Sequence, residues 1–402
     1  MELGSTTSVV VVGAGPVGLA VGSTLAAAGV EHVVLDRAVA GANTSRAAVV
    51  HARTLEVLEG LGVSAELVEK GVIVPHFAIR DRDSTLVRIG FAGLPTAHPY
   101  TLMVPQDVTE SVLAADLARR GSGVLRGHEV LDCVPTPDGR ARVEVDGPRG
   151  RRAITADVVV GADGMHSRVR ETAGIAFRGA AYASSFVLAD VVLDWPLPGD
   201  EVQLFFSPAG LVVVAPLPGG RHRVVATVDE APERPTRDDI AALLQARGPR
   251  AGVAVTEVRW SSRFRVHHRL AEHYRRGPVF LAGDAAHVHS PAGGQGMNIG
   301  IQDGIDLGQR LVAVLAGGDP ATLDGYEATR RPVAARVVRL TDRITRAATL
   351  AGPAARLRNL ALQTLGSLPP VRHAAAMNLA ELAPVAPTRL LSSSATSAAA
   401  HS

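Results

Sequence analysis

The sequence predicts an α/β fold in which a parallel sheet is interleaved with an α+β part built on an antiparallel or mixed sheet and followed by a C-terminal helical region. Three observations support this. Apolar strand patterns end in glycine-rich turns at Val9–Val12, Ala156–Val160 and Val279–Asp284, as is typical of strands buried on both faces. Short strands with Pro-Gly and Gly-Gly turns fill residues 178–268. A basic helical pattern begins at Gly325.

Composition limits the possible functions. The chain has 402 residues, of which 47% are apolar, so it can bury a large core. Its formal net charge of +2 is too small to drive binding to nucleic acid or to an anionic membrane. Cys133 is the sole cysteine, which fits a reducing compartment, and glycines interrupt the apolar segment Val9–Val30. We therefore expect a cytoplasmic protein without a membrane span.

A βαβ unit opens the chain. Val9–Val12 predicts a strand, Gly18–Gly29 a helix and Glu31–Asp36 a second strand, and this order implies a parallel sheet. Further helices are expected at Ser45–Leu61 and Thr109–Arg120.

Gly13, Gly15 and Gly18 form a GxGxxG motif between the first strand and the helix. The first glycine allows a tight turn, the second lets a pyrophosphate approach the backbone, and the third lets helix and strand pack closely. Asp36 ends the next strand, where a carboxylate can accept hydrogen bonds from a ribose. The motif in this context predicts a bound dinucleotide; the alternative is a tight turn without a ligand.

Two later motifs place an aspartate beside a glycine at the end of a strand. Val158–Arg170 (VVVGADGMHSRVR) contains Asp163, and VFLAGD ends in Asp284. Ligands bind at the carboxyl ends of strands in such sheets. The alternative for both aspartates is a helix cap or a turn. A glycine-rich loop, His287–Asn298 (HVHSPAGGQGMN), follows the last motif.

With these motifs in this order, residues 9–333 resemble the single-component (class A) FAD-dependent aromatic monooxygenases of the p-hydroxybenzoate hydroxylase type. The segment Ser45–Gly62 (SRAAVVHARTLEVLEGLG) makes the chain most similar to actinobacterial polyketide hydroxylases. The resemblance implies a Rossmann-like FAD-binding domain and non-covalent FAD. It further implies NADPH or NADH as a transient co-substrate, and hydroxylation of an aromatic substrate with O2 through a flavin C4a-hydroperoxide.

The resemblance also implies roles for particular residues. Pro291 would lie where flavin and substrate meet, while catalysis would rest on the flavin rather than on a protein nucleophile. The implied FAD-binding residues are Gly13, Gly15, Gly18, Asp36, Arg37, Arg46, Gln106, Asp163, Asp284, Gly296, Met297 and Asn298.

The expected FAD-binding domain is discontinuous, comprising residues 1–75, 104–178 and 269–350. Residues 76–103 and 179–268 would form the substrate domain, 351–391 a C-terminal helical region and 392–402 a disordered tail. We expect a monomer or a homodimer with no nucleic-acid or membrane partner.

The substrate pocket is expected to draw on Val202–Val214, Ala226–Val228 and Phe77–Phe91, with Phe205 and Phe206 as its main aromatic pair. Such a mostly aliphatic lining favours a large, flat, weakly polar ligand of polycyclic or polyketide-like character.

Other functions stay open at this point. An FAD-dependent reductase or dehydrogenase would use the same fold, as would a non-catalytic FAD sensor. A flavin-dependent halogenase is less favoured, because the only lysine, Lys70, lies outside the flavin motifs. His287 and His289 have i, i+2 spacing and no third ligand nearby in sequence, so no metal site is expected.

Overall fold

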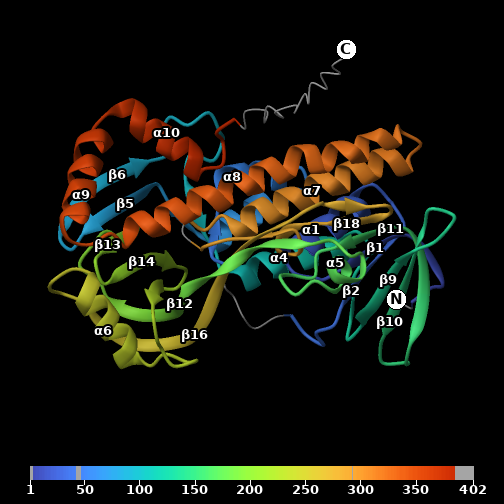
Figure 1. Cartoon of the computed structure of the whole chain (residues 1–402), viewed down its shortest axis with the longest axis horizontal. Coiled ribbons are helices and arrows are strands. Elements are labelled where there is room, and N and C mark those ends of the chain that lie inside the picture. The colour runs from blue at the N-terminus through green and yellow to red at the C-terminus, as the bar shows by residue number, and fades with distance from the viewer. Residues whose placement is uncertain (1–2, 42–46, 292, 385–402) are drawn as a thin grey trace, which may run out of the picture.

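A computed structural model describes residues 3–41, 47–291 and 293–384. The molecule has two halves, each built on one large sheet (Figure 1). Two long helices, α7 (Gly296–Leu315) and α8 (Asp324–Ala348), pack against each other, and α8 reaches from one half to the other. The predicted α/β architecture, with a parallel sheet, a second sheet and C-terminal helices, is confirmed.

The first sheet has the strand order β17-β18-β11-β1-β2-β8, and β9 and β10 extend it from β11. The pairs of β1 with β2 and β11, of β11 with β18 and of β2 with β8 are parallel, as the βαβ pattern predicted. Its strands are β1 (Thr6–Val12), β2 (His32–Asp36), β8 (Val124–Arg126), β9 (Glu129–Pro135), β10 (Ala141–Asp146), β11 (Arg152–Gly161), β17 (Arg275–Arg276) and β18 (Val279–Leu281).

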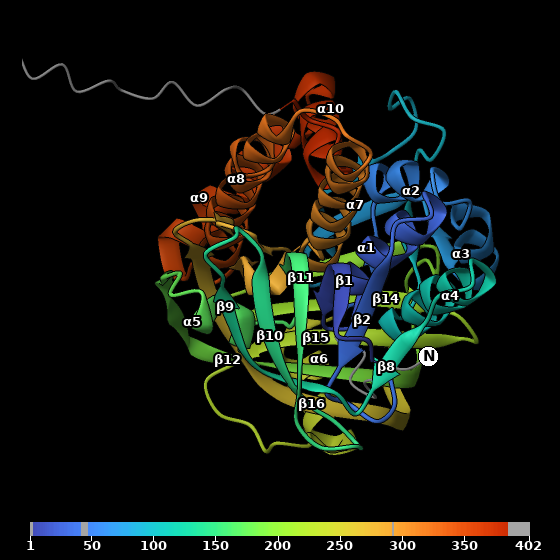
Figure 2. The same cartoon turned by 90° about the vertical axis from the view of Figure 1, so that its right-hand side faces the viewer.

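Helices gather beside these parallel strands (Figure 2). The valines of β1 are fully or almost fully buried because the sheet is covered on both faces, and α1 packs against α4 and α7. The helices and 3₁₀ turns of this half are α1 (Pro16–Ala27), α2 (Ala52–Glu59), α3 (Ser64–Lys70), α4 (Gln106–Arg119), α5 (Arg168–Thr172), η1 (Gly283–Ala285) and η2 (Pro320–Leu323).

The predicted helix Ser45–Leu61 is wrong in its first part. Val49 and Val50 form strand β3, which pairs with β7 (Thr101–Met103), and β7 also pairs with β4 (Val72–Val74). His51 has extended backbone dihedrals, so the helix begins only at Ala52. Residues 42–46 lie outside the described residues.

The second sheet is mixed and has the order β19-β16-β12-β15-β14-β13-β5-β6. Its neighbours are antiparallel except for β13 and β5, which are parallel. The strands β12 and β16, each 18 residues long, run from this half into the other (Figure 1). The strands are β5 (His76–Asp81), β6 (Ser84–Gly90), β12 (Phe177–Asp194), β13 (Glu201–Ser207), β14 (Gly210–Leu217), β15 (Arg221–Val228), β16 (Ala254–Ala271) and β19 (His287–Val288).

The two faces of this mixed sheet belong to different clusters of apolar side chains. One face packs against α6 (Arg237–Arg247). The other packs against α8, and at its β5–β6 edge against α9 (Gly352–Gly366) and α10 (Pro369–Leu379). Because side chains alternate along a strand, each strand contributes to both faces. Among the residues that the structure describes, no helix combines the length and apolar character needed to cross a membrane.

Candidate functional site

A chamber of about 510 Å³ lies between the glycine-rich turns of the parallel sheet and one face of the mixed sheet. Its first wall comes from the motif regions that the sequence singled out. These lining residues are Gly15, Pro16, Val17, Ala47, Ala48, Val49, Met103, Gln106, Ala162, Gly164, Met165, Asp284, His289, Ser290, Pro291, Gly293, Gly294, Gln295, Gly296 and Met297. Turns that are far apart in the sequence therefore lie side by side in the wall of the chamber.

The three glycines of the first motif have different steric environments. A Cβ on Gly13 would lie 2.3 Å from the carbonyl oxygen of Ala162, and one on Gly18 would lie 1.8 Å from the carbonyl oxygen of Gly13. A Cβ on Gly15 would meet nothing within 4 Å and would enter the chamber instead. Gly13 and Gly18 thus serve close packing, while Gly15 leaves space for a ligand at the start of α1.

Asp36 lies at the end of β2 and holds the glycine turn. Its Oδ2 accepts a hydrogen bond from the backbone N–H of Ala14 at 2.7 Å, and its Oδ1 accepts one from Ala38 at 2.8 Å. The guanidinium of Arg126 is 3.6 Å away. Arg37, next in the chain, is exposed. Neither Asp36 nor Arg37 lines the chamber, so their contact with the ribose of a cofactor stays a prediction.

The two Asp-Gly motifs have different surroundings. Asp284 lines the chamber on η1. Asp163 does not line it; its Oδ2 accepts a hydrogen bond from the N–H of Val169 at 3.1 Å, which caps α5. Burial raises the pKa of Asp163, and hydrogen bonds from Ser167 and Val169 oppose that shift. The contacts of Asp163 are those of a helix cap, the alternative that the sequence left open. Asp284, in contrast, lies where it can contact a ligand.

The start of α7 forms another part of the wall. Gly296 and Met297 line the chamber, and the first backbone N–H groups of a helix have no acceptor within that helix. Asn298 is buried; its side chain donates to the carbonyl oxygens of Val49 and Gly294, both at 2.8 Å, and accepts from the N–H of His51 at 2.8 Å. Asn298 therefore fixes the turn from which these amides project.

His51, which the sequence reasoning missed, supports the same turn. Its Nε2 is 2.8 Å from the carbonyl oxygen of Gly293, so Nε2 carries the proton and donates. Its Nδ1 then accepts from the hydroxyl of Thr101 at 3.4 Å. Burial lowers the pKa of His51 to about 4, partly opposed by the Gly293 hydrogen bond, so the ring is neutral at physiological pH. His51 lies within the segment Ser45–Gly62 that carries the resemblance, but nothing in that segment assigned a role to the histidine.

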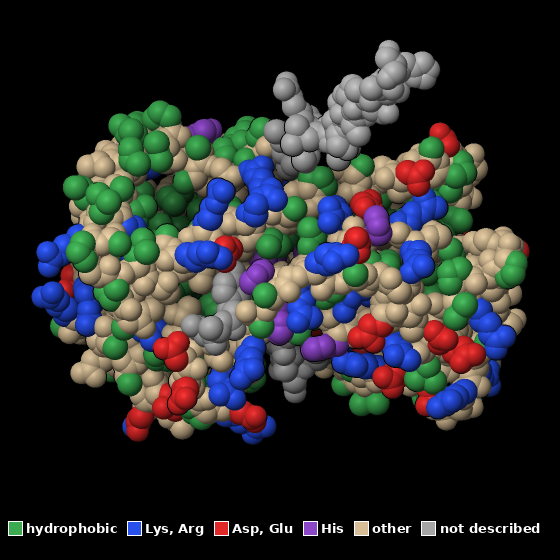
Figure 3. Space-filling view, viewed as in Figure 1, with side chains coloured by type: hydrophobic (Ala, Val, Ile, Leu, Met, Phe, Trp, Pro, Cys, Tyr) green, Lys and Arg blue, Asp and Glu red, His purple; other side chains and the backbone are tan. Residues whose placement is uncertain are grey.

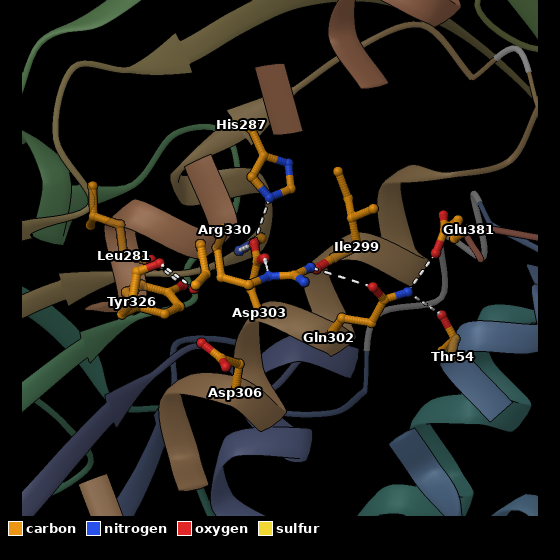
Figure 4. A network of polar contacts seen from close by, with 12 residues as sticks. Thr54, Leu281, His287, Ile299, Gln302, Asp303, Asp306, Tyr326, Arg330 and Glu381 are labelled. Carbon is orange, nitrogen blue, oxygen red and sulfur yellow. Dashed lines mark hydrogen bonds and ion pairs between the residues drawn. The ribbon is translucent and has the colours of Figure 1, made fainter. Parts of the chain in front are cut away.

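A buried polar network lies behind the glycine-rich loop (Figure 4). Asp303 on α7 accepts from His287 Nε2 and from Arg330 Nε, both at 2.6 Å. Burial alone would raise the pKa of Asp303, but Arg330 and His287 outweigh burial and hold that pKa below its usual range. Gln302 continues the network by donating to Thr54 at 3.0 Å and to Glu381 at 2.5 Å. The network joins α7, α8, α2 and Glu381, the second residue after α10.

The mixed sheet supplies the second wall of the chamber. Its lining residues are mostly aliphatic or aromatic; they come from alternate positions of β12, β13, β14 and β15 and from four consecutive positions of β16. They are Phe77, Phe186, Leu188, Val202, Leu204, Leu211, Val213, Ala215, Arg223, Val225, Phe264, Arg265, Val266, His267 and Val288. The expected range 202–214 contributes Val202, Leu204, Leu211 and Val213, whereas the range 77–91 contributes only Phe77. Val225 lines the chamber in place of Ala226 and Val228, which pack on the α6 face.

Phe205 and Phe206 are not the aromatic pair of this chamber. Phe205 points to the α6 face, where its ring meets Trp195 edge-on at 6.0 Å. Phe206 packs in the opposite cluster, under the guanidinium of Arg358 at 5.3 Å. The aromatic pair lining the chamber is instead Phe186 and Phe264, stacked at 5.9 Å.

The other predicted site residues have mixed outcomes. Gln106 lines the chamber at the start of α4, where its Oε1 accepts from the N–H of Ala47 at 3.2 Å. Pro291 also lines it. Arg46 lies outside the described residues. Among those residues, no group of three His, Cys, Asp or Glu side chains could hold a metal ion.

These features fit FAD. Open space at Gly15, a carboxylate at Asp284 and helix-start amides at Gly296 and Met297 suit an extended pyrophosphate cofactor with a flavin ring. Residues 6–341 match the family model described as FAD binding domain. The chain therefore belongs to this family, and FAD is its cofactor.

Two relatives show which named proteins this chain is similar to. The chain is 41% identical over 344 residues to 6-methylpretetramide 4-monooxygenase of Streptomyces rimosus, an alignment that covers 84% of this chain and 61% of the relative. It is 39% identical over 346 residues to the uncharacterized aromatic compound monooxygenase YhjG of Bacillus subtilis, covering 84% of this chain and 68% of the relative. The chain thus spans roughly two thirds of the length of these relatives.

A solved structure matches over nearly its whole length. The crystal structure of p-nitrophenol 4-monooxygenase PnpA from Pseudomonas putida has a TM-score of 0.86 and 28% sequence identity, and the match covers 94% of this chain and 99% of that one.

Proposed function

We propose that this protein is an FAD-dependent monooxygenase that consumes NADPH or NADH and O2 and hydroxylates an aromatic compound, polycyclic or polyketide-like in size. The chamber carries the proposal, because one continuous space has the flavin-binding turns on one side and an aliphatic and aromatic sheet face on the other. The named relatives act on, or are named for, aromatic compounds, which supports the same class of substrate.

The chain's own residues have two tasks in such a reaction. The amides at Gly296 and Met297 would stabilise negative charge on the pyrimidine end of the flavin ring, aided by the positive end of α7. The apolar sheet wall, including Leu204, Val213 and Val225, would hold the substrate and keep water away. The flavin, when bound, supplies the redox and oxygen-activating chemistry.

A nicotinamide nucleotide would visit the site rather than reside in it. The sequence has one strand-GxGxxG-helix unit, and we assign that unit to FAD. Arg265 and His267 line the chamber, with Arg269, His268 and His166 near enough to act electrostatically on His267. Figure 3 shows histidines with Lys and Arg side chains beside them near the middle of one face. A basic rim of this kind suits the phosphates of a transient dinucleotide.

The proposal is tested with purified protein. We expect yellow protein that releases non-covalent FAD on heating, and slow anaerobic flavin reduction by NADPH or NADH alone. An aromatic substrate should accelerate reduction in stopped-flow absorbance, and 18O2 should label the product with one oxygen atom.

Each alternative predicts a different result. An oxidised product without label would indicate a reductase or dehydrogenase. A flavoprotein whose NAD(P)H oxidation no aromatic ligand stimulates would indicate a sensor. Colourless protein that also fails to bind added FAD would contradict the flavin assignment itself. Equal reduction rates with and without substrate would refute control of reduction by the substrate.

A further inference from the structure

A buried ion pair lies among the aliphatic side chains of the sheet wall of the chamber, on strands β12 and β15. Arg223 on β15 donates from Nε to Asp190 Oδ1 at 2.7 Å and from a terminal nitrogen to Asp190 Oδ2 at 2.9 Å. The two side chains are only 4% and 10% exposed. This two-point contact fixes the plane of the guanidinium.

The pair faces the chamber and not the opposite side of the sheet. Arg223 and Val225 both line the chamber, whereas Val224 and Ala226 pack on the α6 face. On the neighbouring strand β12, Asp190 is the register partner of Arg223. It also follows the chamber-lining residues Phe186 and Leu188 in the alternation of side chains.

Stability alone does not account for a charged pair in this position. Burying two charges carries a desolvation cost, and replacing a buried ion pair by apolar residues of similar volume is often neutral or stabilising. The neighbours Leu188, Val213 and Val225 show that this wall accepts aliphatic side chains. Ligand chambers of this kind typically use a few fixed polar groups to orient the ligand.

We propose that Arg223, held by Asp190, is the residue that binds an oxygen atom of the aromatic substrate. The proposal rests on the proposed function, and it adds a requirement on the substrate. Arg223 lines the chamber, and its guanidinium presents N–H donors in several directions, so it can donate to a ligand while the contact with Asp190 is kept. The substrate must then carry a phenol or carbonyl oxygen on the part of the ring system that meets β15.

The ion pair of Arg223 and Asp190 should bind neutral oxygen groups of a ligand in preference to carboxylates. Because Asp190 neutralises Arg223, the wall has no net charge here, and a carboxylate would also meet the negative charge of Asp190. A neutral oxygen gains the hydrogen bond without that repulsion. A ligand whose oxygen meets Arg223 should therefore bind more tightly as a phenol or aromatic ketone than as an aromatic carboxylate of the same size.

Three probes of similar shape test this in the holoenzyme: 2-naphthol, 2-methylnaphthalene and 2-naphthoate. Dissociation constants come from the change in absorbance or fluorescence of bound FAD, a readout independent of turnover. We expect 2-naphthol to bind about tenfold more tightly than 2-methylnaphthalene, as for one hydrogen bond to a charged donor. We also expect 2-naphthoate to bind more weakly than 2-naphthol.

The double variant Arg223→Met/Asp190→Leu removes the donors without leaving an unpaired carboxylate, so it can fold. It should bind 2-naphthol and 2-methylnaphthalene with affinities within about twofold of each other, while Arg223→Lys should keep part of the preference. Arg247→Lys is the matched control. Arg247 is also buried but binds the backbone carbonyls of Leu211 and Thr227, so this change should leave the preference intact.

Several outcomes would overturn the inference. They are equal binding of the two neutral probes in the natural sequence, an unchanged preference in the double variant, tighter binding of 2-naphthoate, or no spectral response of FAD-loaded protein to any probe. Each of these can occur in a protein that still hydroxylates an aromatic substrate. Failure of the proposed function is seen separately, as absence of FAD or of labelled product.

Discussion

Replacing Glu381 by glutamine should make the protein more stable at alkaline pH. Glu381 follows α10, and its carboxyl lies in the network behind the glycine-rich loop, where Oε2 accepts from Gln302. Its Oε1 is buried without a hydrogen-bond partner among the described residues. Burial raises the pKa of Glu381 from 4.5 to about 8, although Gln302 and Arg330 oppose the shift. Glutamine has the shape of the protonated acid and stays neutral.

The direction in which pH changes the free energy of unfolding follows from proton binding to Glu381. Below pH 4.5 the folded and unfolded chains both hold the proton, so the group costs nothing. As pH rises from 4.5 to about 8, the unfolded chain loses the proton first and the folded chain is progressively destabilised. Each unit between the two pKa values corresponds to about 1.4 kcal/mol, which gives at most about 5 kcal/mol above pH 8.

The measurement is urea unfolding of both proteins from about pH 5 to about pH 9, with the free energies of unfolding compared at each pH. The advantage of Glu381→Gln should be near zero at the acidic end and grow to several kcal/mol at the alkaline end. Both residues keep the same positive φ at position 381, so backbone strain cancels. Glu56→Gln, which removes a helix-surface ion pair with Arg53, should change stability by less than about 1 kcal/mol at every pH. Parallel pH curves for Glu381→Gln and the natural protein would refute the reasoning.

Three further substitutions separate ligand contact from support of the fold. Gly15→Val should leave the apoprotein folded but weaken FAD binding at least about a hundredfold by fluorescence titration. Gly13→Ala should lower the free energy of unfolding by more than about 1 kcal/mol, because φ of Gly13 is +100° and Ala162 is too close for a Cβ. Asp284→Ala should weaken FAD binding about tenfold to a hundredfold, and the control Asp163→Ala should chiefly lower stability by about 0.5 to 2 kcal/mol; equal effects on FAD would contradict the assignment. His51→Phe should lower stability by about 1 to 3 kcal/mol and also weaken FAD binding, because the glycine-rich loop loses its donor; unchanged affinity would show that this support is dispensable.

The sequence was sufficient where local signals agree with the fold. Four successive valines, three spaced glycines and Asp36 predicted β1, α1 and β2 because each signal concerns residues close in the chain. The sequence was insufficient where distant strands decide. Val49 and Val50 read as part of a helix, yet they form a strand because Thr101–Met103 lies beside them.

The dependence on distant strands also explains why the prediction of Phe205 and Phe206 as the aromatic pair of the chamber was wrong. Phe205 and Phe206 are adjacent, so a strand must send them to opposite faces, and neither face is known until β5 and β14 set the register. Asp163 and Asp284 are each next to a glycine in the sequence. Only the packing of their turns places Asp284 in the chamber and Asp163 at the start of α5.

The alternation along β13 has a consequence for how substrate range could change during evolution. Val202 and Leu204 line the chamber, while Gln203 and Phe205, which alternate with them, are buried on the other side. Substitutions at the first pair alter the shape offered to a substrate without touching the packing of α6. Enzymes with different substrates can therefore share this scaffold, and a laboratory library aimed at new substrates should vary every second residue of the sheet and leave the intervening ones as they are.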